Sequence, residues 1–89
     1  MVYLISYDLN RPGQNYDTLY QKIKDASTGG WCHPMDSTWI IQSYLTPENI
    51  CNQLRPALDN SDSIFVVQIA SNYAGRLPKD LWNYIENMF

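Results

Sequence analysis

The first segment of the chain alternates between two sets of residues, and both sets are largely apolar. Val2, Leu4 and Ser6 fall on one face of an extended chain, and Tyr3, Ile5 and Tyr7 fall on the other. This pattern predicts a central strand over residues 2–7 that is covered on at least one side. The strand runs directly into Asp8, and Arg11-Pro12-Gly13 then predicts a loop.

A helical pattern follows this loop. Asn15 is a favourable N-cap, and the next apolar residues recur at i, i+3, i+4 and i+7, namely Tyr16, Leu19, Tyr20 and Ile23. This spacing predicts an amphipathic helix of about three turns. Gly29-Gly30 is expected to stop the helix, because glycine is unfavourable inside one.

Residues 31–45 return to a strand pattern with one interruption. Trp31 begins an apolar stretch, Pro34 interrupts it, and residues 37–45 alternate with β-favouring residues. Because proline cannot donate a hydrogen bond to a neighbouring strand, the segment predicts a hairpin or bulged pair with Pro34 on an edge strand or at a bulge.

A second helix and a further strand come next. Thr46-Pro47-Glu48 has the cap, the first-position proline and the first-turn acid that open a helix. The predicted buried stripe of this helix is Ile50, Leu54 and Ala57-Leu58. Residues 62–70, DSIFVVQIA, give the clearest strand pattern in the chain.

Pro78 opens a third predicted helix, whose apolar side is Leu81, Trp82, Ile85 and Phe89. The order is therefore β-α-β-β-α-β with an added C-terminal helix, which is the ferredoxin-like plan of an α+β domain with an antiparallel sheet. No repeat or linker interrupts residues 1–89, so we expect one domain. Helices cover one face of such a sheet, and we expect the other face to be free and to need a partner.

The composition fits a compact domain and gives no general attraction to nucleic acid. Hydrophobic residues make up 45% of the chain and charged residues 17%, which is not typical of disorder. A formal net charge of −3 means that a polynucleotide must meet a local basic patch. We expect no membrane span and no signal peptide. Cys32 and Cys51 lack the spacing of a metal site or disulfide framework, and we interpret them as reduced thiols of a cytoplasmic protein.

Three short motifs, in order along most of the chain, resemble a known family. LISYDLN places Tyr7-Asp8 at the end of the first strand, DSTWIIQS begins with Asp36-Ser37, and DSIFVVQI opens with an aspartate at the fourth strand. These motifs resemble the CRISPR-associated endoribonuclease-like family, whose small Cas-two subunit partners the CRISPR integrase. The family's basic residue early in the first helix is absent, since this helix opens Tyr16-Asp17-Thr18.

The missing basic residue and the more aromatic second strand make the chain similar to a divergent set of small standalone proteins, which are related to that family in fold. A family of virulence-associated toxin ribonucleases shares the fold as well, so the fold alone does not fix an activity.

The resemblance implies a homodimer in which two first-strand aspartates face each other across the two-fold axis. It makes Asp8 and Ser37 candidate catalytic residues, and it makes Asp8 the ligand of a shared divalent ion, usually Mg²⁺, that activates water against a phosphodiester of RNA or DNA. The physical chemistry is coherent, because Mg²⁺ prefers oxygen ligands and keeps several waters. A two-fold dimer axis also supplies a second Asp8 carboxylate, from the other subunit.

Asp8 has a structural interpretation too. Its carboxylate can accept hydrogen bonds from the amides of residues 10–13 and so shape the turn after the strand. Asn10 and Arg11 lie beside it as candidate phosphate contacts, Arg11 through a bidentate pair, and an exposed turn is the alternative for both. Ser37 and its neighbour Asp36 precede a strand, where both also suit turn capping.

His33 is the single histidine, and it lies next to Cys32. The two cannot act as nucleophile and base, because neighbours on a strand point to opposite faces. We interpret His33 as a strand-edge residue, with a role at a dimer or ligand site as the alternative. Among the tryptophans, the spacing favours core or interface positions for Trp39 and Trp82. Trp31 follows two glycines and is the candidate for exposure and for stacking on nucleic-acid bases.

The loop before the third helix contains the best local phosphate site in this acidic chain. Helix N-termini attract anions, and Arg76 and Lys79 add two positive charges around Pro78. The alternative is a left-handed turn that leads into a packed helix.

Two classes of function therefore stay open. The first is a homodimeric nucleic-acid-binding protein with divalent-metal-dependent endonuclease activity at Asp8. The second is a non-catalytic dimeric module that binds a nucleotide or a partner protein, for example a counter-defence protein of a phage or mobile element. The acidic balance and the single strand-end carboxylate favour the second class.

Overall fold

The structure is a computed structural model that describes residues 1–10 and 16–89. The elements in these residues are β1 (Val2–Asp8), α1 (Tyr16–Ala26), β2 (Trp31–Met35), β3 (Thr38–Gln42), α2 (Pro47–Leu54), the short 3₁₀ helix η1 (Arg55–Ala57), β4 (Ser63–Ile69) and α3 (Lys79–Glu86). This confirms the predicted order of strands and helices. The predicted Asn15 cap, the loop at residues 11–13 and the candidate Arg11 lie outside the described residues.

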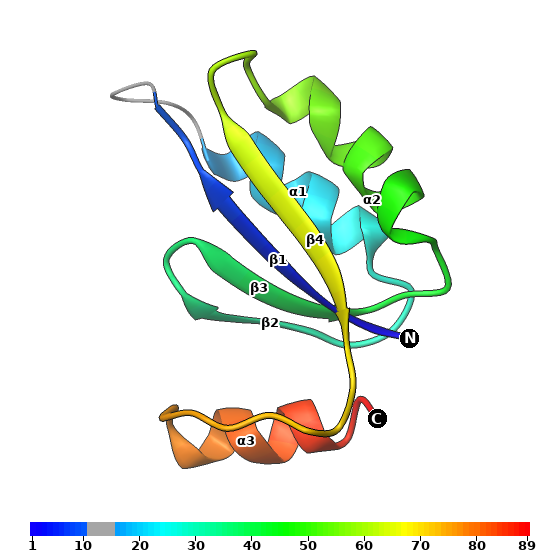
Figure 1. The fold of residues 1–89 in the computed structure, drawn as a ribbon, viewed down its shortest axis with the longest axis vertical. Helices are drawn as coiled ribbons and strands as arrows, with labels where there is room; N and C mark the ends of the chain where they lie inside the picture. The colour runs from blue at the N-terminus through cyan, green and yellow to red at the C-terminus, as the bar shows by residue number, and fades with distance from the viewer. Residues whose placement is uncertain (11–15) are drawn as a thin grey trace.

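The four strands form one antiparallel sheet in the order β2-β3-β1-β4, so β1 is central and pairs with β3 and β4. Figure 1 shows α1 and α2 together on one side of the sheet, with α3 separate from them near the end where β4 finishes. The domain is thus a small α+β structure with a four-stranded antiparallel sheet and, in the described residues, three α-helices. It is compatible with a ferredoxin-like fold.

The first face of the sheet packs against α1 and α2. Tyr3, Ile5 and Tyr7 of β1 point to this face, as their alternation predicts, and all three are buried. They pack with Trp39 and Ile41 of β3. The helices contribute Leu19, Ile23, Ala26, Ile50 and Leu54 to the same core. The apolar stripes seen in the sequence therefore meet in one cluster.

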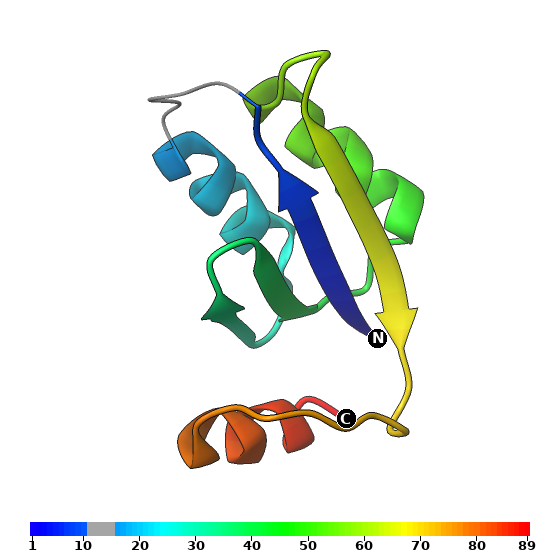
Figure 2. The same cartoon turned by 60° about the vertical axis from the view of Figure 1, so that its left-hand side comes forward.

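The second face is not free, which corrects the expectation from the sequence. Ile85 and Met88, at and just after the end of α3, pack against Val2, Cys32 and Ile40, and all five residues are buried. Figure 2 shows α3 beside the end of the sheet where β4 finishes, away from the turn that follows β1. At the other end Ser6, Asp8, Ser63 and Phe65 share the second face, and we call these four residues the open half. Phe65 is 65% exposed there.

The boundaries of β2 and β3 follow from local chemistry. The register between the two strands shifts between Cys32 and Met35, so Pro34 lies at a bulge of an edge strand, as predicted. The strand β3 begins at Thr38 and ends at Gln42, which is shorter than the predicted 37–45. Directly after the strand, the Ser43 hydroxyl donates to the Ala26 carbonyl at 2.8 Å and accepts from the Leu45 amide at 3.1 Å.

Candidate functional site

Asp8 is the last residue of β1 and lies opposite Ser63 of β4. It borders a shallow pocket of about 200 Å³, together with Ser6, Phe65 and their neighbours on the two strands. Its side chain is exposed, and within residues 1–10 and 16–89 no hydrogen bond or ion pair engages its carboxylate. The oxygens of Asp8 are therefore accessible to a ligand from solvent.

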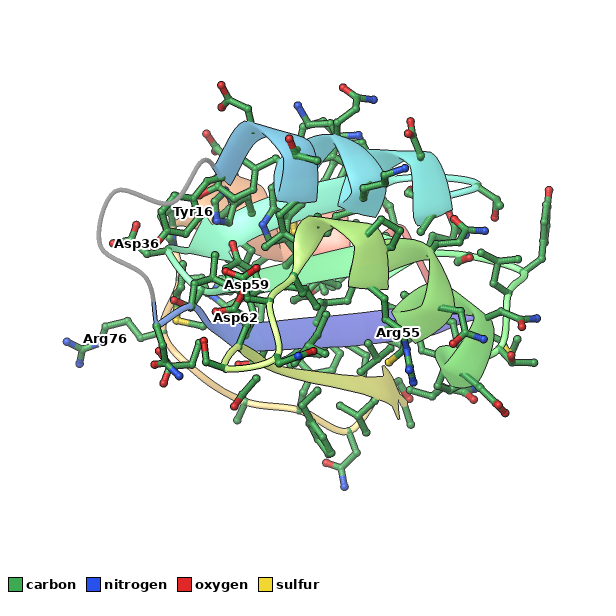
Figure 3. All side chains as sticks on the ribbon, turned by 90° about the horizontal axis from the view of Figure 1, so that it is seen from above. Tyr16, Asp36, Arg55, Asp59, Asp62 and Arg76 are labelled. Atoms are coloured by element: carbon green, nitrogen blue, oxygen red, sulfur yellow. The ribbon has the colours of Figure 1, made fainter. Side chains whose placement is uncertain are left out.

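Asn10, two residues after β1, is held by Asp62, and the amides of residues 11–13 lie outside the described residues. The Asn10 backbone N–H donates to one carboxylate oxygen of Asp62 at 3.0 Å, and the Asp59 N–H donates to the other at 2.8 Å. The side-chain amide of Asn10 also donates to the Ser61 carbonyl. Figure 3 shows Asp59 and Asp62 beside each other at this end of the sheet. At the Asn10 amide, the hydrogen bond that was proposed for Asp8 is therefore made by Asp62 instead. A phosphate contact by Asn10 stays a prediction.

Ser37 lies in the turn between β2 and β3, next to the end of β1. Its carbonyl accepts a hydrogen bond of 3.1 Å from the backbone N–H of Tyr7, the residue before Asp8. The side chain of Ser37 is exposed. The topology therefore brings the two candidate catalytic residues, Asp8 and Ser37, to the same end of adjacent strands.

A polar network beneath this end of the sheet was not foreseen from the sequence. The Tyr7 hydroxyl donates to the Asp36 carbonyl at 3.0 Å and accepts from the Trp39 indole N–H at 3.2 Å. The His33 Nε2–H donates to the same carbonyl at 3.1 Å. Burial raises the pKa of the Tyr7 phenol well above its ordinary value, and the hydrogen bond from Trp39 opposes part of that rise. The sequence did contain a signal for this network: Tyr7 lies on the same face of its strand as Tyr3 and Ile5, and a tyrosine hydroxyl that is buried needs hydrogen-bond partners.

Trp31 and His33 belong to an aromatic cluster at the β2 edge. The His33 ring stacks on Trp39 with 4.3 Å between ring centroids, and the Trp31 ring lies 5.2 Å from Trp39. The Lys24 ammonium sits 4.8 Å from the centroid of the Trp31 ring. The Trp31 side chain is 39% exposed, as expected, and base stacking on it stays a prediction. Trp39 is 1% exposed, which confirms its predicted place in the core.

Arg76 and Lys79 are not brought to Asp8. Arg76 lines a second pocket, between the sheet and α3, which shares no lining residue with the pocket at Asp8. Lys79 is the first residue of α3, and Pro78 caps the helix without a side-chain hydrogen bond. Gly75 does not adopt a left-handed φ, so the alternative of a left-handed turn in this loop does not hold at its glycine.

The described residues hold no group of three or more histidine, cysteine, aspartate or glutamate side chains that are placed to bind a metal. One chain therefore offers Asp8 as a single carboxylate on the open half. Both cysteines are free, Cys32 buried and Cys51 half-buried. Burial also raises the pKa of the Cys32 thiol, against a smaller effect of a hydrogen bond with the Ile40 backbone.

Comparisons with known proteins give no family for this chain: no protein-family model and no curated protein matches it. In the part of the chain that the structure describes, no helix has the length and apolar character needed to cross a bilayer.

Proposed function

We propose that the chain is a homodimeric nucleic-acid-binding protein of the Cas-two-like class, with a ferredoxin-like fold and a metal-dependent endonuclease site at Asp8. One observation carries this proposal. Asp8 is exposed beside Phe65 on the part of the second face that α3 leaves uncovered, and no described residue pairs with its carboxylate. Phe65 supplies apolar surface and Asp8 supplies accessible oxygens at this place, and the proposal takes the two together as part of a dimer interface.

Two-fold packing of this surface against a second copy supplies what one chain lacks. Such an interface uses the same patch on both subunits, so a two-fold axis that passes beside Asp8 would bring two Asp8 carboxylates together. Two carboxylates suit Mg²⁺, which binds hard oxygen donors and retains several waters. When bound, Mg²⁺ supplies a Lewis acid that activates water and neutralises charge on a phosphodiester. Ser37, at the neighbouring turn, is the second polar group of the proposed site.

The proposed nucleic-acid contacts use few cations. Asn10 and Arg11 come two and three residues after Asp8 in the sequence and are the nearest candidates along the chain for binding the backbone phosphates. Trp31, Arg76 and Lys79 are the further candidates, and none of them lines the pocket at Asp8. We propose a cytoplasmic location, because free cysteines suit a reducing compartment.

The test is cleavage of labelled RNA and DNA with Mg²⁺ or EDTA, by the wild type and by Asp8→Asn and Ser37→Ala. Because Asp8→Asn removes the metal-ligating carboxylate from both subunits of the homodimer, it is expected to lower the cleavage rate at least about 100-fold, since metal affinity and transition-state charge stabilisation are lost together. Asp25→Asn is the matched control, because Asp25 is an exposed acid on α1 that accepts from Gln21 at 2.9 Å. Equal rates for the wild type and Asp8→Asn contradict the proposal, as does a wild type without activity.

A second candidate function is a non-catalytic dimeric module that binds a nucleotide or a partner protein. The observation that favours it is that Asp8 is the one carboxylate among the four residues of the open half, and that the described residues hold no group of three or more side chains placed to bind a metal. Binding of nucleotide or RNA that survives Asp8→Ala and fails on Trp31→Ala or Arg76→Ala supports this candidate over the nuclease.

A further inference from the structure

An apolar groove of about 320 Å³ lies on the second face, separate from the open half. Its base is formed by Leu4, Ile40 and Ile69 of the sheet, one side by Trp82 and Ile85 of α3, and the other by residues 73–77 of the connection from β4 to α3. The volume falls within the range of pockets that bind small molecules, about 300 to 1,000 Å³.

The walls of this groove are held by contacts of their own. The Tyr73 ring stacks on Trp82 with 5.9 Å between centroids and an interplanar angle of 1°, and its centroid lies 5.6 Å from that of Phe89. Ile85 is 1% exposed and anchors α3 to the sheet. The connection and the helix thus support each other without a ligand, and a preformed site loses little conformational entropy on binding.

Charge restricts what can occupy the groove. Among the described residues that line it, Arg76 alone carries a charge at neutral pH, and the others are apolar or aromatic apart from the Tyr73 hydroxyl. Arg76 lines the groove and is exposed, and Figure 3 shows its side chain extended outward from the ribbon. We therefore assign its guanidinium to the mouth of the groove. A ligand therefore meets apolar surface inside and one cation at the entrance.

We propose that this groove binds a small monomeric carboxylate with an apolar tail, such as a medium-chain fatty acid. The tail lies between the sheet and the Trp82 indole, and the carboxylate pairs with Arg76 at the mouth. A nucleotide does not suit the interior, because a base or sugar buried there would lose its hydrogen bonds to water without replacement. The proposal does not depend on Asp8 or on an active dimer.

The binding assay is displacement of the fluorescent anion anilinonaphthalene sulfonate by hexanoate, octanoate and decanoate. Each added methylene is expected to tighten binding about threefold, since burial of a methylene is favourable by a nearly constant amount. Acetate, which has the charge without a tail, is expected to give no displacement. Equal displacement by all four acids contradicts the proposal.

Two variants separate the roles of charge and shape. Arg76→Gln is expected to weaken decanoate about three- to fivefold, as for an exposed ion pair, and to leave decanol unchanged. Arg55→Gln is the matched control, because Arg55 is another exposed arginine and does not line the groove. If Arg55→Gln weakens decanoate as much as Arg76→Gln does, the attraction is general and the assigned site is wrong.

Gly75→Leu tests the shape of the groove. A Cβ at Gly75 would lie 3.6 Å from the Trp82 ring, an ordinary contact distance, so a larger side chain extends along the indole. We expect at least tenfold weaker decanoate binding for Gly75→Leu and little change for Gly75→Ala. Ala74→Trp, on the same connection, is a second filling variant in case Gly75→Leu does not fold. Wild-type affinity in a folded filling variant overturns the proposal.

Two other occupants are distinguished in the same experiments. If decanoate binds only below the concentration at which the protein dimerises, the groove is covered by a second copy and the proposal is wrong. If the protein sediments with phosphatidylglycerol vesicles but does not bind monomeric decanoate, the surface recognises a membrane and the proposal is also wrong. Binding of decanoate with the same affinity across the dimerisation range supports it.

Discussion

The two faces of the sheet are made from alternate residues of the same strands, but they differ in how completely the helices cover them. On the first face, under α1 and α2, the buried polar groups have partners: the Tyr3 hydroxyl donates to the Leu45 carbonyl at 2.6 Å, and the Tyr7 hydroxyl joins Trp39 to Asp36. On the second face α3 covers only one end. Between α3 and the open half lies an apolar groove, and Phe65 is exposed.

This difference in coverage assigns stability mainly to the first face and binding mainly to the second. On the first face Tyr3, Ile5, Tyr7 and Trp39 are buried, while Trp31 at the β2 edge is 39% exposed, so this face holds the larger packed core and specifies the fold. The second face keeps apolar surface in contact with water, together with the exposed carboxylate of Asp8, which has no partner among residues 1–10 and 16–89; such surface adds little to stability and is available for binding. Substitutions on the two faces are therefore expected to have different consequences, even between neighbouring residues.

The largest expected contrast is between Ile5→Ala and Leu4→Ala. Ile5 is fully buried on the first face, and its truncation should lower the free energy of unfolding by about 2–5 kcal/mol through lost burial and a cavity. Leu4 is half-buried beside the groove, and its truncation should lower it by about 1 kcal/mol. Urea unfolding followed by far-UV circular dichroism measures both. Equal losses would mean that the groove is as tightly packed as the core.

For β1 the sequence could separate the residues into two faces, because they alternate strictly over residues 2–7, but both sets are largely apolar and the pattern does not show which face the helices α1 and α2 cover. It could not predict how far α3 covers the second face. The apolar side of α3 shows that the helix packs on something, but the position of Ile85 and Met88 against Val2 and Cys32 depends on the path of residues 70–78. No local pattern encodes that path.

The second prediction concerns the buried hydroxyl of the first face. Tyr7→Phe removes the acceptor of the Trp39 N–H and one donor to the Asp36 carbonyl. A buried N–H without a partner costs about 1–3 kcal/mol, so the free energy of unfolding should fall by that amount at neutral pH. Tyr44→Phe is the control, because the Tyr44 side chain is 81% exposed, and it should have no effect.

The same residue gives a pH dependence with a definite sign. Burial raises the pKa of Tyr7 in the folded state, so above about pH 10, where an exposed tyrosine ionises, the unfolded chain releases a proton that the folded chain retains. Stability from this group is fully present below that pH and is lost as the pH rises. Urea unfolding between pH 8 and 11 should show a smaller decline for Tyr7→Phe than for the wild type. Parallel curves would mean that Tyr7 does not cause the decline.

Some features of the candidate site could be predicted from the sequence and others could not. Asp8 was recognisable as an acid at a strand end, and Ser37 as a residue at the start of a strand. That Asp62, distant in sequence, would take the Asn10 amide and leave Asp8 without this partner depends on the pairing of β1 with β4. Such long-range pairing is set by the whole sheet, and no short motif specifies it.

The next prediction concerns the N-cap of α2, one of the two helices that pack on the first face. The Thr46 hydroxyl oxygen accepts from the Asn49 N–H at 3.1 Å and caps α2, the helix behind β4. Thr46→Ala should lower the free energy of unfolding by about 1 kcal/mol, and Thr46→Ser should restore most of it, since serine caps equally well. Chemical denaturation of the three proteins measures the difference. A loss that serine does not restore would point to the Thr46 methyl group instead of the cap.

The smallest expected effect on stability belongs to Phe65→Ser, on the open half of the second face. Because the Phe65 ring is 65% exposed, the free energy of unfolding of the monomer should change by no more than about 0.5 kcal/mol. Self-association, in contrast, should weaken at least about tenfold if this ring lies in the proposed dimer interface, because aromatic residues at the centre of an interface contribute most of its binding energy. Sedimentation equilibrium measures the dimer constant, with Tyr44→Ser as a control for the loss of another exposed ring. A variant that loses much stability and dimerises normally would place Phe65 among the residues that hold the fold, and the distinction between the two faces would then fail at the residue where it should be clearest.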